Sequence, residues 1–403
     1  MNTRITCLLL FVIAHASAIA APKFPLTLEA GIEFFSNGVF LENNLSVTSL
    51  DWSSDGKLLL SNGIKTVLKG NKKDFERHLA IWDAITWDEA KKKTVFKFLR
   101  SDTRAEFIDP KNNNRVAVTT EKGIGIINIK RPKGKPRILG KGLFTTKAGK
   151  GKWPNMYWSK DGRKFATHHF SNGKDDKDGE AISVIDAADG KKHTLSLSLV
   201  TFARGRRLPP LISWSPDGEF LAFTGFQEIL IYDSTLENEL ARYTSPRQII
   251  NIPPGGFSGL LEWSKDGGKL FVAGAFGKAI YIDTLLLPDL KKGGRKFLKK
   301  AHASIKLEPS GLQEIVLDPQ ARRIALGESK TILANGRIIR IDPVVRIYHL
   351  GTGKLLHDFD DIEPYVQSRK TQFTVKKLVW SPDGFKIAAG LDDGTIRIFK
   401  TPK

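Results

Sequence analysis

Hydrophobic and polar residues alternate with a period of two over many short segments of this chain, and a polar turn separates each segment from the next. The clearest example is Leu221-Ala222-Phe223, which follows Pro216-Asp217-Gly218. Asp-Gly provides the positive φ that a tight turn needs, and alternating segments on both sides of such a turn are typical of two paired strands. The pattern therefore predicts β-hairpins along the whole chain.

One short string, Trp-Ser-x-Asp-Gly, occurs at each of the strongest hairpin signals. Its five copies begin at Trp52, Trp158, Trp214, Trp263 and Trp380. Degenerate copies begin at Phe107, before Ile108-Asp109-Pro110, and at Leu317, before Asp318-Pro319. The seven positions, called anchors below, lie roughly fifty to sixty residues apart, a period typical of solenoids and propellers.

Each unit continues with two more strand patterns. A third strand ends in an acid or an aromatic residue, as in Ile229–Asp233, and a fourth follows a small turn, as in Leu355–Phe359. Four antiparallel strands per unit make one propeller blade. We therefore predict an all-β fold, a seven-bladed β-propeller of four-stranded antiparallel blades, with residues 21–403 as one domain.

The last copy, from Leu378 to Phe399, resembles a full repeat of the WD40 family and its bacterial WD40-like relatives. The units are longer than the ~40–45 residues of a WD40 repeat, the Gly-His dipeptide that precedes a typical repeat is missing, and only one third strand ends in a Trp-Asp pair, Trp82-Asp83. The resemblance implies the propeller fold. It implies little about function, because propellers host unrelated activities on one scaffold.

The end of the chain predicts how the ring closes. The sequence stops a few residues after the third strand of the seventh unit, so that unit lacks an outer strand. The segment from Phe24 to Phe40 alternates apolar positions and belongs to no unit. We predict that it pairs as the outer strand of the last blade, which would remove free sheet edges.

Residues 1–20 have the pattern of a secretory signal peptide: Arg4, an apolar core over 7–14, and Ala18-Ile19-Ala20 as a small-residue cleavage site. A membrane anchor is the competing interpretation, but the core is far shorter than the ~20 apolar residues of a span. We expect an exported protein, periplasmic or secreted, without a transmembrane segment. Cys7 is the only cysteine, so the mature chain would hold neither a disulfide nor a cysteine-ligated metal.

Basic residues exceed acidic ones by a formal charge of +20. The excess is concentrated between Lys130 and Lys152, where no acid occurs. Such a patch is typical of a surface that binds a polyanion or an acidic protein, although solvated loops would give the same pattern. Nucleic acid is a poor candidate partner for an exported protein. The candidate binding residues are Lys130, Arg131, Lys133, Lys135, Arg137, Lys141, Trp153, Arg204, Arg206 and Arg207.

The candidate cofactor-binding and metal-binding motifs do not have the residue spacing that these sites require. Gly123–Asn128 begins like a dinucleotide loop but fits the third strand of the second unit better. The acidic turn at 175–180 lacks the first and twelfth ligands of a calcium loop, and His168 and His169 are adjacent on a strand and cannot chelate one ion together. We predict no catalytic residue, metal or cofactor, and a repeated packing role for the anchor residues.

These observations favour a monomeric, exported, non-catalytic binding or scaffold module for a protein or an anionic envelope ligand. The alternatives are a glycan-active or redox propeller enzyme with its site in the central channel, and a component of an envelope assembly. Two units carry about fifteen extra residues between their second and third strands, Gly63 to His78 and Glu328 to Pro343. Insertions on one face of a repeat protein commonly form its binding face.

Overall fold

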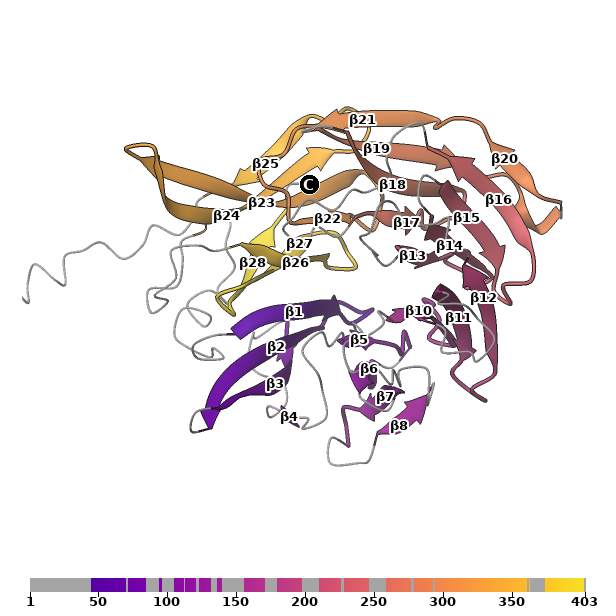
Figure 1. The fold of residues 1–403 in the computed structure, drawn as a ribbon, viewed down its shortest axis with the longest axis horizontal. Helices are drawn as coiled ribbons and strands as arrows, with labels where there is room; N and C mark the ends of the chain where they lie inside the picture. Colours follow the sequence, from indigo (N-terminus) through magenta and orange to yellow (C-terminus); the bar gives the residue numbers. More distant parts are fainter. Residues whose placement is uncertain are drawn as a thin grey trace, which may run out of the picture.

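The protein is a seven-bladed β-propeller (Figure 1), seen here in a computed structural model. Seven small sheets, mostly of four antiparallel strands, stand around one axis, as predicted. The single helical turn described is the 3₁₀ helix η2 (Leu290–Lys292). The structure describes residues 45–69, 72–84, 94–95, 105–111, 113–120, 123–131, 136–139, 156–170, 180–197, 210–225, 228–245, 259–276, 279–292, 294–360, 362 and 374–401.

The strands follow the chain blade by blade, each blade running from its innermost strand outwards. Blades 1 to 3 contain β1 (Leu45–Trp52), β2 (Leu58–Lys69), β3 (Lys72–Asp83) and β4 (Thr94–Val95); β5 (Ala105–Phe107), β6 (Arg115–Thr120), β7 (Gly123–Asn128) and β8 (Arg137–Leu139); and β9 (Met156–Trp158), β10 (Lys164–Phe170), β11 (Glu180–Asp186) and β12 (Lys192–Leu197). Blades 4 and 5 contain β13 (Ile212–Trp214), β14 (Phe220–Thr224), β15 (Glu228–Asp233) and β16 (Glu239–Thr244); and β17 (Leu261–Trp263), β18 (Lys269–Phe276), β19 (Ala279–Leu286) and β21 (Ala303–Leu307). Blades 6 and 7 contain β22 (Glu314–Leu317), β23 (Arg323–Ala334), β24 (Arg337–His349) and β25 (Leu355–Phe359); and β26 (Val375–Trp380), β27 (Lys386–Leu391) and β28 (Ile396–Lys400).

Two sheets depart from the predicted four strands. Blade 4 gains a fifth strand, β20 (Lys296–Leu298), which comes from the third-to-fourth connection of blade 5 and pairs parallel with β16. This strap covers the outer edge of blade 4, which would otherwise be open for pairing. Blade 7 has three described strands. The predicted closing segment, Phe24 to Phe40, lies outside the described residues, as does the predicted signal peptide.

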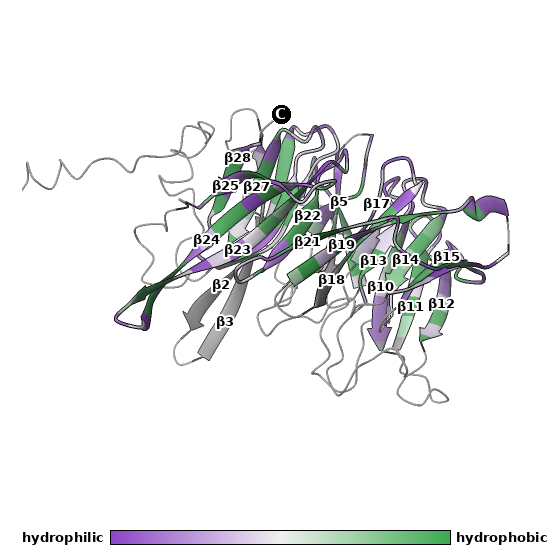
Figure 2. Cartoon of the chain, turned by 90° about the horizontal axis from the view of Figure 1, so that it is seen from above, coloured by the Kyte–Doolittle hydropathy of each residue, from purple (hydrophilic) through white to green (hydrophobic). Residues whose placement is uncertain are grey.

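The core lies between the blades, because both faces of each sheet pack against a neighbour. Seven clusters of buried side chains fill the seven junctions. One of them joins Val47, Leu50 and Trp52 of blade 1 to Ala388 and Ile398 of blade 7, so the first and last blades are in direct contact. Coloured by hydropathy, the strands of the body carry much of the apolar sequence (Figure 2).

The Trp-Ser-x-Asp-Gly string builds the same turn each time. In blade 4 the Ser215 hydroxyl donates to Asp217 Oδ1 at 2.6 Å and accepts the backbone N–H of Phe220 at 2.9 Å. Asp217 Oδ1 also accepts the N–H of Glu219, and Gly218 has a φ of 70°, the left-handed region that favours glycine. The serine and aspartate of the string thus form hydrogen bonds within the turn itself. This structural role explains why the string recurs, without any external ligand.

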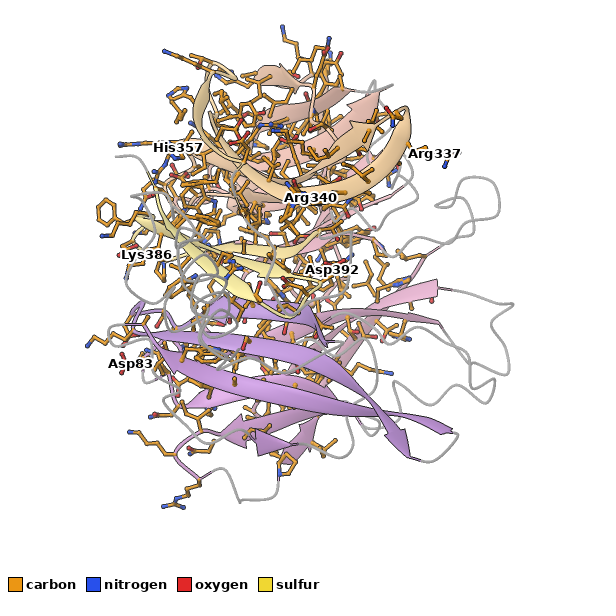
Figure 3. All side chains as sticks on the ribbon, turned by 90° about the vertical axis from the view of Figure 1, so that its left-hand side faces the viewer. Asp83, Arg337, Arg340, His357, Lys386 and Asp392 are labelled. Atoms are coloured by element: carbon orange, nitrogen blue, oxygen red, sulfur yellow. The ribbon has the colours of Figure 1, made fainter. Side chains whose placement is uncertain are left out.

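Two hairpins extend far beyond their sheets. The strands β2 and β3 remain paired to Lys69 and Lys72, and β23 and β24 remain paired to Ala334 and Arg337. Both two-stranded ribbons project from the same side of the ring, the right-hand side of Figure 3, where Arg337 lies. Asp83 and Lys386 lie at the opposite side. We call these sides the ribbon face and the turn face, since the Trp-Ser-x-Asp-Gly turns lie on the second.

Candidate functional site

The two sequence insertions form the outer parts of the ribbons. Residues 63–69 with 72–78 and residues 328–343, which belong to the segments expected as extra between second and third strands, continue the strand pairing outwards. The pairing has one register shift, between Ile332 and Leu333. The strands β2 and β23 each have 12 residues, whereas β6 and β14, the second strands of blades 2 and 4, have 6 and 5. Among the described second strands, β2 and β23 are the longest, so the ribbons are a clear departure from the repeat.

The base of the blade 6 ribbon is held by a buried ion pair. Glu328 is fully buried and accepts hydrogen bonds from Arg346 Nη1 at 2.8 Å and from the backbone N–H of Ser310 at 2.7 Å. Arg346 Nε donates to Asp358 Oδ2 at 3.0 Å. Burial raises the pKa of Glu328, although Ser310 and Arg346 oppose that rise. The ribbon therefore leaves the body from a fixed root.

The tip of the same ribbon is apolar and exposed. Leu333 and Ile338 are each 59% exposed, and Ile339 is 52% exposed. Leu333 lies opposite Ile338 across the ribbon, while Ala334 lies opposite Arg337. Large aliphatic side chains this exposed, gathered at one projecting tip, are typical of an interaction surface.

The predicted basic patch is only partly described. Lys133, Lys135, Lys141, Trp153, Arg204, Arg206 and Arg207 lie outside the described residues. Lys130 and Arg131 are exposed in the turn after β7, and Arg137 begins β8, where its Nη2 donates to the carbonyl of Ala188 in blade 3 at 2.6 Å. Lys130 and Arg131 follow the third strand of blade 2 and Arg137 begins its fourth strand, so all three lie on the turn face. The fold therefore does not bring them together with the ribbon tips.

Each anchor residue ends the innermost strand of its blade: Trp52, Phe107, Trp158, Trp214, Trp263, Leu317 and Trp380. In four blades the indole N–H donates to a backbone carbonyl of the preceding blade: Trp52 to Val379, Trp214 to Tyr157, Trp263 to Ser213 and Trp380 to Val316, at 2.8–3.4 Å. Trp158 is the exception, since its buried Nε1 has no partner among the described residues. The tryptophans therefore join neighbouring blades, and the bond from Trp52 to Val379 joins the first blade to the last.

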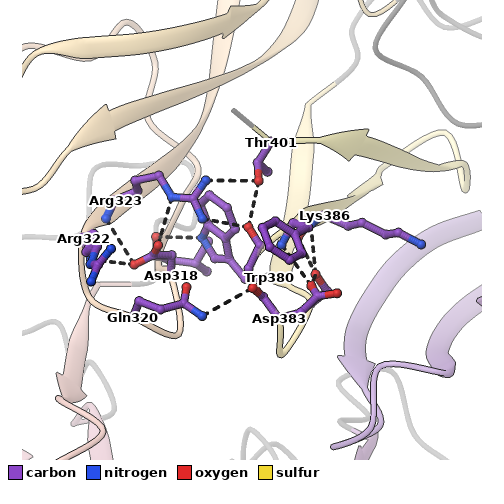
Figure 4. A network of polar contacts seen from close by, with 12 residues as sticks. Asp318, Gln320, Arg322, Arg323, Trp380, Asp383, Lys386 and Thr401 are labelled. Carbon is purple, nitrogen blue, oxygen red and sulfur yellow. Dashed lines mark hydrogen bonds and ion pairs between the residues drawn. The ribbon is translucent and has the colours of Figure 1, made fainter. Parts of the chain in front are cut away.

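The degenerate anchor of blade 6 is supported by a polar network (Figure 4). Asp318 takes the place of the serine and accepts the backbone N–H of Arg322 at 2.7 Å. Arg323 donates to Asp318 Oδ2 at 2.9 Å, to the carbonyl of Gly384 at 2.7 Å and to Thr401 Oγ1 at 3.1 Å, and its guanidinium stacks over the Trp380 ring. This network fastens blade 6 to blade 7.

Acidic residues stand directly before the anchor in three innermost strands, a feature that was not predicted from the sequence. Asp51 accepts the backbone N–H of Phe107 at 2.6 Å, which ties blade 1 to blade 2. Glu106 and Glu262 hold the equivalent positions in blades 2 and 5. Burial raises the pKa of Glu262 to about 7, and the charge of Lys160 opposes this only in part. A carboxyl group with that pKa exchanges a proton near neutral pH.

Groups that hold metal ions are not found in the described part of the chain: no three His, Cys, Asp or Glu side chains come together there. His168 and His169 lie on β10, and His169 Nε2 is 2.8 Å from the Ser183 hydroxyl. The acidic turn at 175–179 lies outside the described residues. Of the helices that the structure describes, none has the length and apolar character that crossing a membrane requires.

The last blade matches a known family of repeats. Residues 366–400 match the WD40 family, described as WD domain, G-beta repeat. The match covers β26, β27 and β28, the copy in which the sequence pattern is most complete. No curated protein matches the chain.

Proposed function

We propose that this chain, a WD40-like propeller, works as an exported, non-catalytic binding scaffold that docks a protein or an anionic envelope ligand on its ribbon face. WD40 propellers commonly serve as scaffolds that bind proteins. The observation that carries the proposal for this chain is the pair of ribbons. They are the parts that the repeat does not require, and they project together from one face.

Three further features support the proposal. The formal charge of +20 favours an anionic or acidic partner over a basic one. The signal-peptide pattern of residues 1–20 favours a role outside the cytoplasm. On the turn face, serine, aspartate and arginine side chains form hydrogen bonds within the protein, as at Ser215, Asp217 and Arg323, which favours the ribbon face as the docking surface.

The test is capture of partners from an envelope extract by residues 21–403 at low and high salt. A matched variant has both ribbons shortened, each closed by Asn-Gly, so that the blade portions of β2, β3, β23 and β24 remain. We expect a discrete protein or an acidic polymer to bind the full chain and not the shortened one. Equal capture by both chains would refute the ribbon face as the docking site, and a cytoplasmic location of the full-length protein in cell fractions would refute export.

A channel enzyme is the second candidate, and Glu262 is the observation that favours it. Its carboxyl has a pKa of about 7 on an innermost strand, which suits a general acid or base. A hydrolytic activity on envelope glycans that disappears in Glu262→Gln, with folding intact, would support the enzyme. Activity unchanged by that substitution would count against this site.

A further inference from the structure

The two ribbons carry a similar four-residue string at the same position of their second strands. Lys65-Thr66-Val67-Leu68 in β2 corresponds to Lys330-Thr331-Ile332-Leu333 in β23. Each string begins six residues after the residue that pairs with its anchor, Leu59 opposite Trp52 and Ile324 opposite Leu317. Both ribbons then close over two residues, between the pairs Lys69–Lys72 and Ala334–Arg337. Among the described residues, no other second strand extends beyond the first position of this string, so the match is a property of the ribbons and not of the blade repeat.

The blade 6 ribbon has one apolar and one basic face. Across the strands, Thr331 lies opposite Ile341 and Leu333 opposite Ile338. Neighbouring side chains of a strand point to opposite faces, so Ile332 with Arg340 and Ala334 with Arg337 occupy the other face. A register shift between Ile332 and Leu333 leaves Ile339 as an extra residue, exposed like its neighbours.

Charge at this tip has one sign. From Ser329 to Ile341 the sequence holds Lys330, Arg337 and Arg340 and no acid. Lys330 is paired with Asp360 at 3.1 Å and Arg340 with Asp342 at 2.7 Å, both nearer the body, while Arg337 is exposed at the turn. The turn of the blade 1 ribbon is also basic in sequence, with Lys69, Lys72 and Lys73 around it.

We propose that the two ribbons are a pair of prongs that dock the propeller on an anionic lipid bilayer, with Leu333, Ile338 and Ile339 of the blade 6 tip entering the headgroup region. This inference rests on the proposed docking role of the ribbon face and names its partner. The exposed aliphatic residues of the blade 6 tip, next to Arg337, complement an anionic membrane surface in both polarity and charge.

The shape of the prongs favours a bilayer over a folded protein. A stable protein interface buries about 800 Å² on each partner and needs matched shapes, whereas a two-stranded ribbon is narrow and convex. A bilayer needs only apolar side chains and cations at the same depth. The two prongs, on blades 1 and 6 with blade 7 between them, project from the same side of the ring. Contact of both prongs with one planar surface would multiply the affinity of each.

The tight turn at the tip keeps this geometry. Asn335 and Gly336 both have positive φ, 51° and 72°, as a two-residue turn of the primed type requires. The ion pair of Glu328 and Arg346 fixes the other end of the ribbon. The aliphatic residues are thus presented on a rigid arm, so that insertion needs no refolding.

The experiment is co-sedimentation of residues 21–403 with vesicles of phosphatidylglycerol and phosphatidylcholine, or of phosphatidylcholine alone. We expect binding to the anionic vesicles and weak binding to the neutral ones. The triple variant Leu333→Ser/Ile338→Ser/Ile339→Ser should bind anionic vesicles at least about ten-fold more weakly, because serine gains none of the free energy that an aliphatic side chain gains on moving from water into the bilayer. Each of Lys69→Gln and Arg337→Gln should lower binding about five-fold at low salt. Phe385→Ser, which removes an apolar side chain 53% exposed on the turn face, is the matched control and should leave binding unchanged.

Insertion itself is read from a probe at the tip. The mature chain is predicted to be free of cysteine, so Ile339→Cys and Phe385→Cys each accept one environment-sensitive dye. We expect a blue shift with anionic vesicles for the dye at position 339 and none at position 385. Absence of vesicle binding, or binding unchanged by the triple variant, would overturn the membrane proposal. If the full chain then still captured an envelope protein through its ribbons, the binding scaffold would stand with a protein as its partner.

Discussion

The indole hydrogen bonds between blades give a sharp test, because two tryptophans at equivalent positions differ in one contact. Trp214 Nε1 donates to the carbonyl of Tyr157 at 2.8 Å, whereas the buried Nε1 of Trp158 has no partner among the described residues. Replacing either by phenylalanine removes a similar part of the ring and costs about 1 kcal/mol for the space left behind. The two substitutions therefore differ mainly in the fate of the N–H group.

The free energies of unfolding should separate the two variants. Trp214→Phe also loses a hydrogen bond worth about 1 kcal/mol. Trp158→Phe removes an unsatisfied donor whose burial costs about 1–3 kcal/mol, which offsets the lost packing. We expect Trp214→Phe to be less stable than Trp158→Phe by about 2 kcal/mol, measured by urea unfolding followed by circular dichroism. Equal losses in the two variants would refute the idea that the indole N–H group stabilises the blade junctions.

Three further predictions concern other parts of the ring. Burial raises the pKa of Glu262 from its ordinary 4.5 to about 7, so stability is highest below pH 4.5 and falls as the pH rises through 7, where the buried carboxyl group becomes charged. Glu262→Gln should remove this pH dependence and raise the free energy of unfolding at pH 8 by up to about 3 kcal/mol; an unchanged pH profile would be the contrary result. At Gly390 an added Cβ would lie 2.5 Å from Val47 Cγ1, so Gly390→Ala should cost about 1–3 kcal/mol in thermal unfolding and Val47→Ala should restore part of it. Removal of residues 21–43 should expose the edge of β28 and produce aggregation in light scattering, and a monodisperse shortened chain would disprove Phe24 to Phe40 as the closing strand.

The sequence was sufficient for the propeller because its signals are local. Asp-Gly turns and period-two alternation define each inner hairpin without reference to the rest of the chain. Even the degenerate copy of blade 6 keeps its geometry: Ala321, at the position of the turn glycine, adopts a φ of 53°. The strap β20 was not predicted, since its parallel pairing with β16 depends on which blade lies beside the connection and not on any local pattern.

The candidate site was harder to predict for the same reason. The sequence indicated where the insertions occur, but Ser329–Pro343 reads equally well as a loop. Only the register shows that its alternation continues into a ribbon and places Leu333 opposite Ile338. The similar strings Lys-Thr-Val-Leu and Lys-Thr-Ile-Leu are present in the sequence. Their equivalence follows only from the strand pairing, in which Leu59 and Ile324 lie opposite the anchors of their blades. The basic run from Lys130 drew attention by its composition, which carries no information about the face it reaches.

The distribution of satisfied polar groups makes the two faces of the ring unequal. On the turn face, each complete string closes its turn with its own serine and aspartate, and Arg323 divides its donors among Asp318, Gly384 and Thr401. Groups already engaged in this way gain little from a partner, because a new contact would first break an existing hydrogen bond. On the ribbon face, Leu333, Ile338 and Ile339 remain exposed to water, and covering them releases free energy without breaking any internal bond. Binding by this propeller is therefore expected where the repeat has been extended, and the turn face serves to hold the blades in place.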